Sequence, residues 1–184
     1  MNPKAEFDWD RGSEIEQLHL VRLMDWPAQR LLAQRYDWSQ HPEAVLGWIT
    51  AQKNLDLASV LCAFFNGDPM RYNYVGKRDV PAAHRGECRL LDAILFRVNS
   101  GFYLPDPAVG MPQPAKLANW LNYQQEDADE DRVGRWVFDT EIVQAVMPVA
   151  AAPKPTPAPK PAYGPIGGWM QRVLGKVPES RLTH

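Results

Sequence analysis

The chain has 184 residues, enough for one domain and a tail. Apolar residues make up 45%, so a hydrophobic core of ordinary size is available, and the formal net charge of -2 argues against a dedicated nucleic-acid binder. No apolar stretch approaches the length of about eighteen residues that a membrane-spanning helix needs.

The first residues and the cysteines indicate a cellular compartment. The opening stretch "MNPKAEFDWD" is acidic and has no apolar h-region, so we expect no signal peptide. The two cysteines, Cys62 and Cys88, lie in apolar helical patterns without a CxxC partner, which favours a reducing environment. The sequence therefore predicts a cytoplasmic protein.

The first three predicted helices begin at recognisable start signals. Ser13 and Glu16 have the spacing of a capping box, and Asp25 precedes Pro27, which is tolerated in the first turn of a helix. The third helix begins at Pro42. The expected apolar faces are Ile15, Leu18, Val21 and Leu23 or Met24 in the first helix, Leu31 and Leu32 in the second, which ends near Tyr36, and Val45, Leu46, Trp48 and Ile49 in the third.

The fourth predicted helix, "LASVLCAFF", follows a capping Asp56 and is apolar on nearly every side. A helix without a polar face is normally buried, so we expect this one at the centre of the core. Asn66 and Gly67 follow it, as residues at helix C-termini commonly do.

The second half of the body alternates helices with irregular segments. The segment from Pro69 to Arg85 predicts a loop with a short extended stretch at "RYNYV", and the proline-rich "FYLPDPAVGMPQP" predicts a connector. A fifth helix ends at Gly101, "AKLANWLNYQQ" predicts a shorter helix, "RWVF" a strand or turn, and Thr140 is expected to cap "EIVQAVM". The apolar stripe of the fifth helix is Leu90, Leu91, Ile94, Leu95 and Val98.

The composition changes at the end of the body. We expect an all-α fold, a single compact orthogonal helical bundle over residues 1–148, then a proline-rich linker at 149–165 and a short amphipathic segment at 166–184. The tail from Ala150 carries a net charge of +4; because the whole chain carries -2, the preceding body carries -6. We expect this proline-rich C-terminal tail to be disordered.

The apolar residues of the last segment recur at helical spacing. Trp169, Met170, Val173, Leu174 and Val177 lie at i, i+1, i+4, i+5 and i+8, which predicts one apolar stripe on a helix of two turns. So short a helix is marginal alone in water, but it can form when its apolar face enters a groove. The sequence thus predicts a tethered docking motif for a protein partner, with a frayed terminus or a stripe that folds back onto its own body as the alternatives. Two basic residues and a short stripe are weak for a membrane surface.

Three short motifs stand in a fixed order between Leu31 and Met111. They are "RYDWSQH", "NLDLASVLCAFFNGDP" and "AILFRVNSGFYLPDP". In this order they resemble an uncharacterised family of small bacterial helical domains, in which acidic residues and a glycine usually follow the tryptophan; this chain has Ser39, Gln40 and His41 there. The resemblance implies a helical fold, and it implies no catalytic residue because no activity is attached to such domains.

An acidic stretch partly matches a calcium-binding loop. Asp127, Asp129 and Asp131 have the spacing of the first, third and fifth positions, but Arg132 replaces the required glycine and Phe138 the bidentate glutamate. A solvated acidic loop is the preferred interpretation. We therefore predict no metal and no cofactor.

One histidine lies near a cysteine. His84 precedes Cys88 by four residues, with Arg85 and Arg89 nearby, and a thiolate needs such a base or positive charge to be reactive. A convincing pair needs a third, orienting group, so a small core cysteine is the preferred interpretation. No residue is predicted to be catalytic.

The aromatic residues and the tail favour a binding protein. Most of the seven tryptophans are expected in the core, but Tyr36 and Trp38, which flank Asp37 at a helix end, are interpreted as the rim of a surface groove. The first hypothesis is therefore a non-enzymatic protein-interaction module, which binds through Tyr36, Trp38 and the tail residues Trp169, Met170, Val173 and Leu174.

Two other functions remain open from the sequence. An immunity or adaptor protein would bind a single protein partner through an acidic face. A small enzyme would assemble its site from loops, around Asp37, His41, Tyr72 and Tyr74, because residues that are distant in sequence leave no linear motif. The oligomeric state is not predicted.

Overall fold

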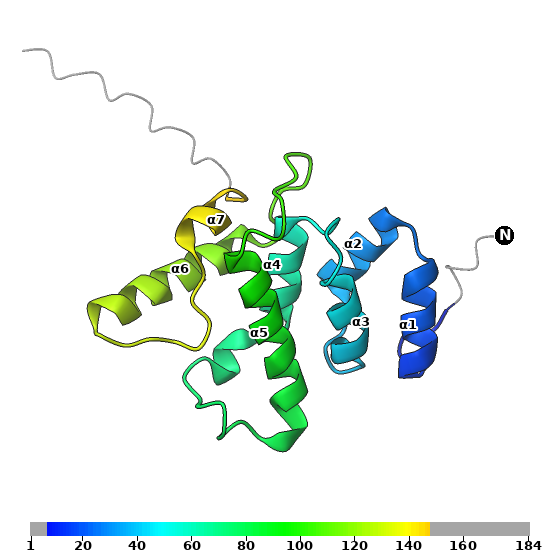
Figure 1. Cartoon of the computed structure of the whole chain (residues 1–184), viewed down its shortest axis with the longest axis horizontal. Coiled ribbons are helices and arrows are strands. Elements are labelled where there is room, and N and C mark those ends of the chain that lie inside the picture. The colour runs from blue at the N-terminus through cyan, green and yellow to red at the C-terminus, as the bar shows by residue number, and fades with distance from the viewer. Residues whose placement is uncertain (1–6, 148–184) are drawn as a thin grey trace, which may run out of the picture. The chain divides into compact units, whose positions relative to one another are not determined.

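Helix α4 (Leu57–Asn66) lies at the centre of the structure, a computed structural model in which residues 7–147 are described (Figure 1). Nine of its ten residues, Leu57 to Phe65, are buried. Its N-terminus is fixed by Asp56, which accepts hydrogen bonds from the Ser59 backbone N–H at 2.8 Å and the Ser59 hydroxyl at 2.7 Å. The sequence prediction of a capped, central fourth helix is confirmed.

The described residues are helical and contain no strand, so the all-α prediction is confirmed. They form seven α-helices and two short 3₁₀ turns, η1 and η2. In chain order these are α1 (Glu14–Leu23), α2 (Trp26–Arg35), α3 (Pro42–Ile49), α4, η1 (Pro69–Tyr72), η2 (Ala82–His84), α5 (Arg85–Asn99), α6 (Pro114–Asp129) and α7 (Thr140–Gln144).

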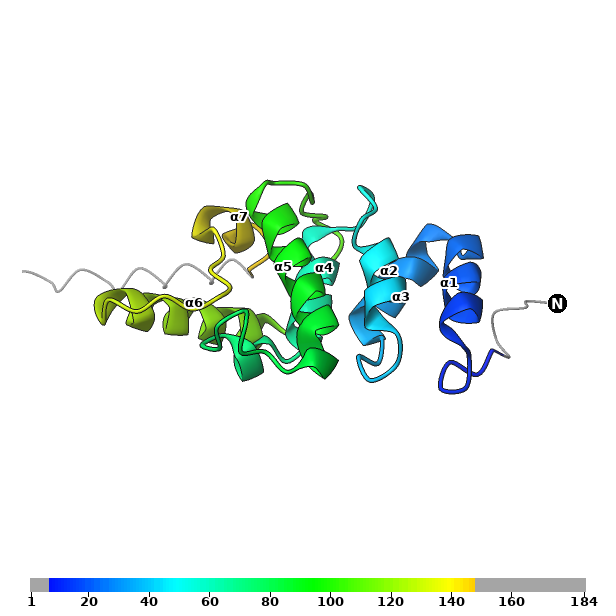
Figure 2. The ribbon, with the colours of Figure 1, turned by 60° about the horizontal axis from the view of Figure 1, so that its bottom comes forward.

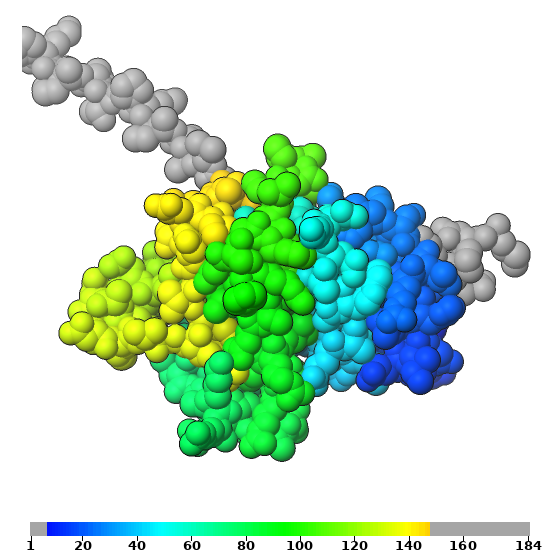
Figure 3. Space-filling model, viewed as in Figure 1, coloured from blue at the N-terminus to red at the C-terminus, as the bar shows by residue number. Residues whose placement is uncertain are grey.

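Helices α2 and α5 pack directly on α4, and the other helices pack on these or on one another. Helix α2 packs on α4, α1 packs on α3, and α5 contacts α3, α4 and α7. In both ribbon views α4 and α5 stay side by side, while α1 and α6 lie at opposite ends (Figures 1 and 2). Helix α5 covers the middle of the face seen in Figure 3. Its buried residues Leu90, Leu91, Ile94 and Val98 confirm the predicted stripe.

Helix α1 buries only part of the face that its sequence predicts: Val21 is buried and Met24 packs against the core. Its capping box is present, but Ile15 and Leu23 are 80% and 65% exposed, and the buried residues are Gln17 and Val21. The Gln17 amide donates to the carbonyl oxygens of Trp9 at 2.7 Å and Gly12 at 3.0 Å. Because its hydrogen bonds are satisfied, a polar side chain can occupy the buried position.

Helix α2 shows the same arrangement. Asp25 caps it and Leu32 packs against the core, as predicted, but Leu31 is 46% exposed, and Gln29 and Ala33 are the buried residues. The Gln29 amide donates to the carbonyl oxygens of Val21 at 3.1 Å and Met24 at 3.0 Å. These carbonyls belong to the C-terminal end of α1, where backbone acceptors lack partners within the helix. A buried glutamine therefore fixes the corner between α1 and α2.

The end of α4 also differs from the prediction. Gly67 has an ordinary φ of -77°, and the left-handed residue is Asp68, with a φ of 47°. The glycine is needed for a different reason: a Cβ on Gly67 would lie 2.6–2.8 Å from three atoms of the Trp38 ring. The following segment forms η1 and η2 in place of the expected extended stretch.

Helix α6 is longer than predicted. It runs to Asp129, so the acidic stretch begins as its last turn, with Asp127 buried. The "RWVF" segment after it has no strand partner among the described residues, and it buries the side chains of Trp136 and Phe138. Asp139, one residue before the predicted cap, accepts from the Glu141 backbone N–H at 3.0 Å and starts α7.

The linker at 149–165 and the segment at 166–184 lie outside the described residues. Within residues 7–147 no helix is long and apolar enough to cross a membrane.

The burial of α4 makes its core packing testable. Leu61 is fully buried, so Leu61→Ala should lower the free energy of unfolding by about 2–5 kcal/mol, measured by chemical denaturation. Leu31→Ala, at a position that is 46% exposed, is the matched control and should cost less than about 1 kcal/mol. Equal losses for the two variants would contradict a central α4.

Candidate protein-binding groove

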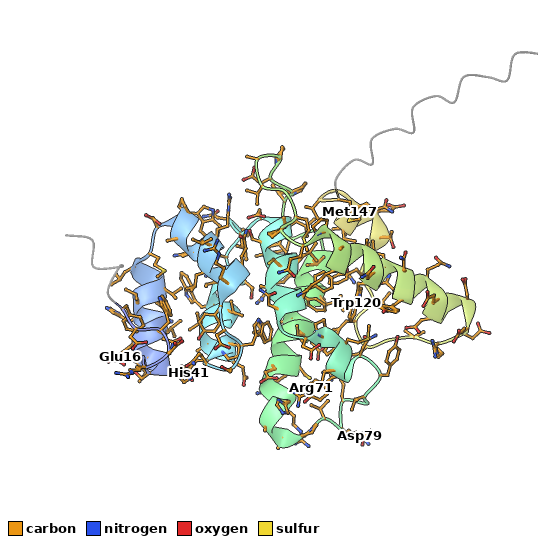
Figure 4. The ribbon with its side chains drawn as sticks, turned by 180° about the vertical axis from the view of Figure 1, so that it is seen from behind. Glu16, His41, Arg71, Asp79, Trp120 and Met147 are labelled. Atoms are coloured by element: carbon orange, nitrogen blue, oxygen red, sulfur yellow. The ribbon has the colours of Figure 1, made fainter. Side chains whose placement is uncertain are left out.

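A groove of about 670 Å³ opens between the end of α2, the turn after α4 and helix α6. Phe65 and Trp120 form its floor; both are buried, and their rings meet edge to face at 5.8 Å. Met70 and Tyr123 stand above the floor and are 37% and 47% exposed. In Figure 4, Trp120 lies between α6 and the η1 turn that carries Arg71. The groove thus presents aromatic and apolar surface to solvent.

The floor is held by aromatic packing beneath it. The Phe64 ring meets Trp120 edge to face at 5.9 Å and Phe138 at 4.9 Å. The Trp120 indole N–H donates to the Trp136 carbonyl at 3.3 Å. On the α2 side, the Asn66 amide donates to the Gln34 carbonyl at 2.8 Å. These contacts hold the floor residues in place, which lowers the cost of ordering them when a ligand binds.

Charged residues line the edges of the groove. Arg35 and Lys116 are exposed on opposite walls, and Asp68 is exposed on the turn between them. Among the described residues of the wall there is no serine, threonine, cysteine or histidine. The arrangement offers an apolar floor with both signs of charge above it, which suits a peptide segment that is apolar on one side.

The predicted rim residues occupy other places. Tyr36 is only 6% exposed, because its hydroxyl donates to the Gln17 side-chain oxygen at 2.5 Å and accepts from the His41 backbone N–H at 3.1 Å. Burial raises the pKa of Tyr36, and the residue lines the groove from within, so the exposed rim position was wrong. Trp38 is partly buried over Gly67 and is not among the groove residues.

The structure does not bring the proposed enzyme residues into one site. Asp37 is exposed, and the Ser39 backbone N–H that donates to it at 2.8 Å lowers its pKa. The Tyr72 ring lies 5.5 Å from the His84 ring, whereas the Tyr74 hydroxyl donates to Asp127 at 2.9 Å. None of the five pockets described in residues 7–147 is lined by more than one of Asp37, His41, Tyr72 and Tyr74.

Asp127 and its neighbours are engaged within the protein. The Asp127 carboxylate accepts from Tyr74 and forms an ion pair with Arg132 at 3.1 Å, and Asp129 accepts from Gln125 at 2.9 Å. Within the described part of the chain, no group of three or more histidine, cysteine or acidic side chains is placed to hold a metal ion.

The environment of Cys88 opposes a reactive thiol. The side chain is 1% exposed, and burial raises its pKa more than the nearby Arg135 lowers it. The Nδ1 atom of His84 lies 3.1 Å from Glu87 Oε2, so the predicted base is directed to a carboxylate. Burial also raises the pKa of the buried Cys62.

Thiol labelling tests whether Cys62 and Cys88 are less reactive than a free thiol. In the native protein, iodoacetamide should modify Cys62 and Cys88 much more slowly than a free model thiol near neutral pH, because both are buried and harder to ionise. Denaturant should expose both to full reaction, as followed by mass spectrometry. Native-state labelling of Cys88 at the model rate would restore the reactive-thiol hypothesis.

A partly buried ion pair that the sequence did not reveal fastens the "RWVF" segment to α5. The Arg135 guanidinium, 9% exposed, donates to both Asp92 oxygens at 3.0 and 2.8 Å, and the Trp136 indole N–H donates to the same carboxylate at 2.9 Å. Burial by itself raises the pKa of Asp92, but the hydrogen bonds and charge of Arg135 outweigh it, so the pKa is lowered.

The pH dependence of this pair can be measured. Asp92→Asn should cost about 2–3 kcal/mol near neutral pH, because it leaves Arg135 buried without its counter-charge. The lowered folded-state pKa means that Asp92 stabilises the fold fully above about pH 4 and that this contribution is lost as the pH falls through the folded-state pKa. The gap between wild type and variant, measured by denaturation, should therefore shrink in acid; a gap that does not change with pH would contradict the pair.

Comparisons of the chain with protein-family models, curated proteins and solved structures found no match. The resemblance to a family of small bacterial helical domains therefore stays a prediction. The sequence did not predict the α6 wall of the groove, although one signal was available: Lys116, Asn119, Trp120 and Tyr123 lie at i, i+3, i+4 and i+7, on one face of α6.

Proposed function

We propose that this protein is a non-enzymatic protein-interaction module of the cytoplasm, and that the groove at α6 receives an apolar segment of a protein partner. The observation that carries the proposal is the preorganised floor of Phe65 and Trp120 beneath the exposed Met70 and Tyr123. Aromatic residues that lie in a partly enclosed, well-packed site are typical energetic centres of protein interfaces.

The dimensions of the groove suit a short helix. The wall residues of α6 run from Lys116 to Tyr123, about 11 Å along the helix axis, which equals two turns of a ligand helix laid beside it. A helix in a groove is held by apolar residues at i, i+3, i+4 and i+7. The partner segment would fill the groove with such a face and keep its polar side in water.

The charges on the rim favour a peptide over a nucleic acid. Arg35 and Lys116 can pair with acidic residues of a partner, and Asp68 with a basic one. A nucleic acid would meet two cations on a body that carries -6 overall, which is unfavourable.

Two further functional hypotheses from the sequence involve other parts of the chain. An immunity or adaptor protein would use an acidic face, for which the exposed Glu126, Asp129, Glu130 and Asp131 at the end of α6 are candidates. Docking of the tail on another protein also stays a prediction.

A peptide selection tests the groove. A library of helical peptides displayed on phage and selected against the full-length protein should yield binders with one apolar face. Met70→Glu should weaken their binding by about tenfold or more, measured by fluorescence anisotropy, because it puts a charge beside the apolar floor.

Ile15→Glu is the matched control. Ile15 is an exposed apolar residue on α1, at the opposite end of the described body from α6, so its substitution should leave the affinity unchanged (Figure 1). Both positions are exposed, and the circular dichroism of both variants should match wild type. If selection yields no binders, or the binders do not distinguish the two variants, the groove is not a docking site.

A further inference from the structure

The charges around the groove differ between its two ends. We infer that the partner segment is an amphipathic helix with acidic residues at one end and basic residues at the other; this inference rests on the proposed function. The acidic end contacts Arg35 and Lys116, and the basic end contacts Asp68 and Glu126. The apolar face of the segment covers the aromatic floor between the two ends.

The two cations of the groove stand on either side of the last turn of α4. The carbonyl oxygen of Gln34, the residue before Arg35, accepts from the Cys62 thiol at 3.5 Å. It also accepts from the Asn66 amide at 2.8 Å. Burial raises the pKa of the Cys62 thiol, and the nearby Lys116 ammonium opposes that shift. In the three ribbon views α4 lies between α2, which ends at Arg35, and α6, which carries Lys116 (Figures 1, 2 and 4).

Helices α4 and α6 pass the floor of the groove in the same direction. Lys116 lies near Cys62. About one turn further along both helices, Phe65 meets Trp120 edge to face at 5.8 Å. Each chain then continues toward the far end of the groove. Tyr123 marks that end on α6, about 11 Å from Lys116 along the helix axis.

Two acidic residues stand at the far end. Asp68 lines the groove from the turn that follows α4. Glu126 follows Tyr123 by three residues and therefore lies on the same face of α6, just past the groove wall. Both side chains are exposed. The groove thus runs from two cations to two carboxylates, and Lys116 and Glu126 are about 15 Å apart along α6.

The charges at the two ends are free to contact a ligand. Within residues 7–147 none of the four forms an ion pair with another described residue, unlike Asp127 and Arg132, which pair with each other at 3.1 Å. A ligand can therefore meet these charges without first breaking an ion pair inside the protein. Complementary charges at both ends then fix the orientation of the ligand in the groove.

A ligand with both signs of charge also suits the charge of the body. A segment that was acidic throughout would be repelled by the body, which carries -6, and by the carboxylates at the far end. A segment with one acidic and one basic end avoids this repulsion. Since salt screens exposed charges beyond about 8 Å at physiological ionic strength, the charges nearest to each end decide how the ligand lies.

The peptide selection tests the order of the charges when the library also varies the residues beside the apolar face. Against the full-length protein, the recovered helices should carry acidic residues at one end and lysine or arginine about ten positions away, which matches about 15 Å along a helix. Selection against the double variant Arg35→Glu/Lys116→Glu should no longer favour the acidic end, because that end would then meet like charges.

Affinity measurements give the size of the effect. By fluorescence anisotropy at about 50 mM salt, a recovered peptide should bind Arg35→Glu/Lys116→Glu about tenfold more weakly than wild type. The difference should shrink at about 0.5 M salt, because exposed ion pairs are screened. A peptide whose acidic residues are replaced by lysine should instead bind the double variant more tightly than it binds wild type.

Arg22→Glu/Lys53→Glu is the matched control. Both positions are exposed cations outside the groove, and the double variant changes the net charge by the same amount. It should leave the affinity unchanged, and both double variants should keep the circular dichroism of wild type. An equal loss of affinity in the two double variants would overturn the inference, because the effect would then come from the overall charge.

The closing comparison separates this inference from the proposed function. Peptides that lose affinity with Met70→Glu but show no order of charges would overturn the inference and leave the groove as a partner site. A selection that yields no groove-binding peptide would overturn both. Peptides with the expected order of charges, whose preference is reversed by Arg35→Glu/Lys116→Glu alone, would support both.

Discussion

The structure depends on the burial of one helix without a polar face. Helix α4 can exist only if other elements cover it on nearly every side, and α2, α5 and the aromatic residues of α6 and the "RWVF" segment do so. Phe64 alone meets Trp120, Trp136 and Phe138. The groove is a consequence of this requirement, because its floor is the outer surface of the aromatic cluster that encloses the end of α4.

Buried polar groups set the angles between the elements. Gln17 and Gln29 hold the first two helices through backbone carbonyls, and the Asp92–Arg135 pair fastens the segment after α6 to α5. Each of these groups is costly to bury alone and specific once paired, since only one arrangement of the chain satisfies it. Apolar packing therefore decides which helices meet, and the polar contacts decide how they are oriented.

The sequence predicted those features that rest on local signals. The caps at Ser13, Asp25 and Asp56 and the strong stripe of α5 are confirmed, because a cap involves only neighbouring residues and the stripe has a clear period. The faces of α1 and α2 were only partly right: Val21 is buried and Met24 and Leu32 pack against the core, but Ile15, Leu23 and Leu31 are exposed. An apolar period indicates burial only when no polar side chain finds better partners, and the partners of Gln17 and Gln29 lie in other segments.

Most of the candidate site could not be predicted from the sequence, because its residues come from separate segments. Its residues come from α2, the turn after α4 and α6, which are separated by up to about ninety positions, and no linear pattern joins them. Tyr36 lines the groove, but it is buried and does not form an exposed rim, because its hydroxyl finds a partner in Gln17. The spacing of the α6 residues shows that they share one face of the helix. Whether that face meets another helix or solvent depends on the neighbouring elements. In this fold Phe64 and Phe65 of α4 cover Trp120, whereas Tyr123, one turn further along α6, stays 47% exposed.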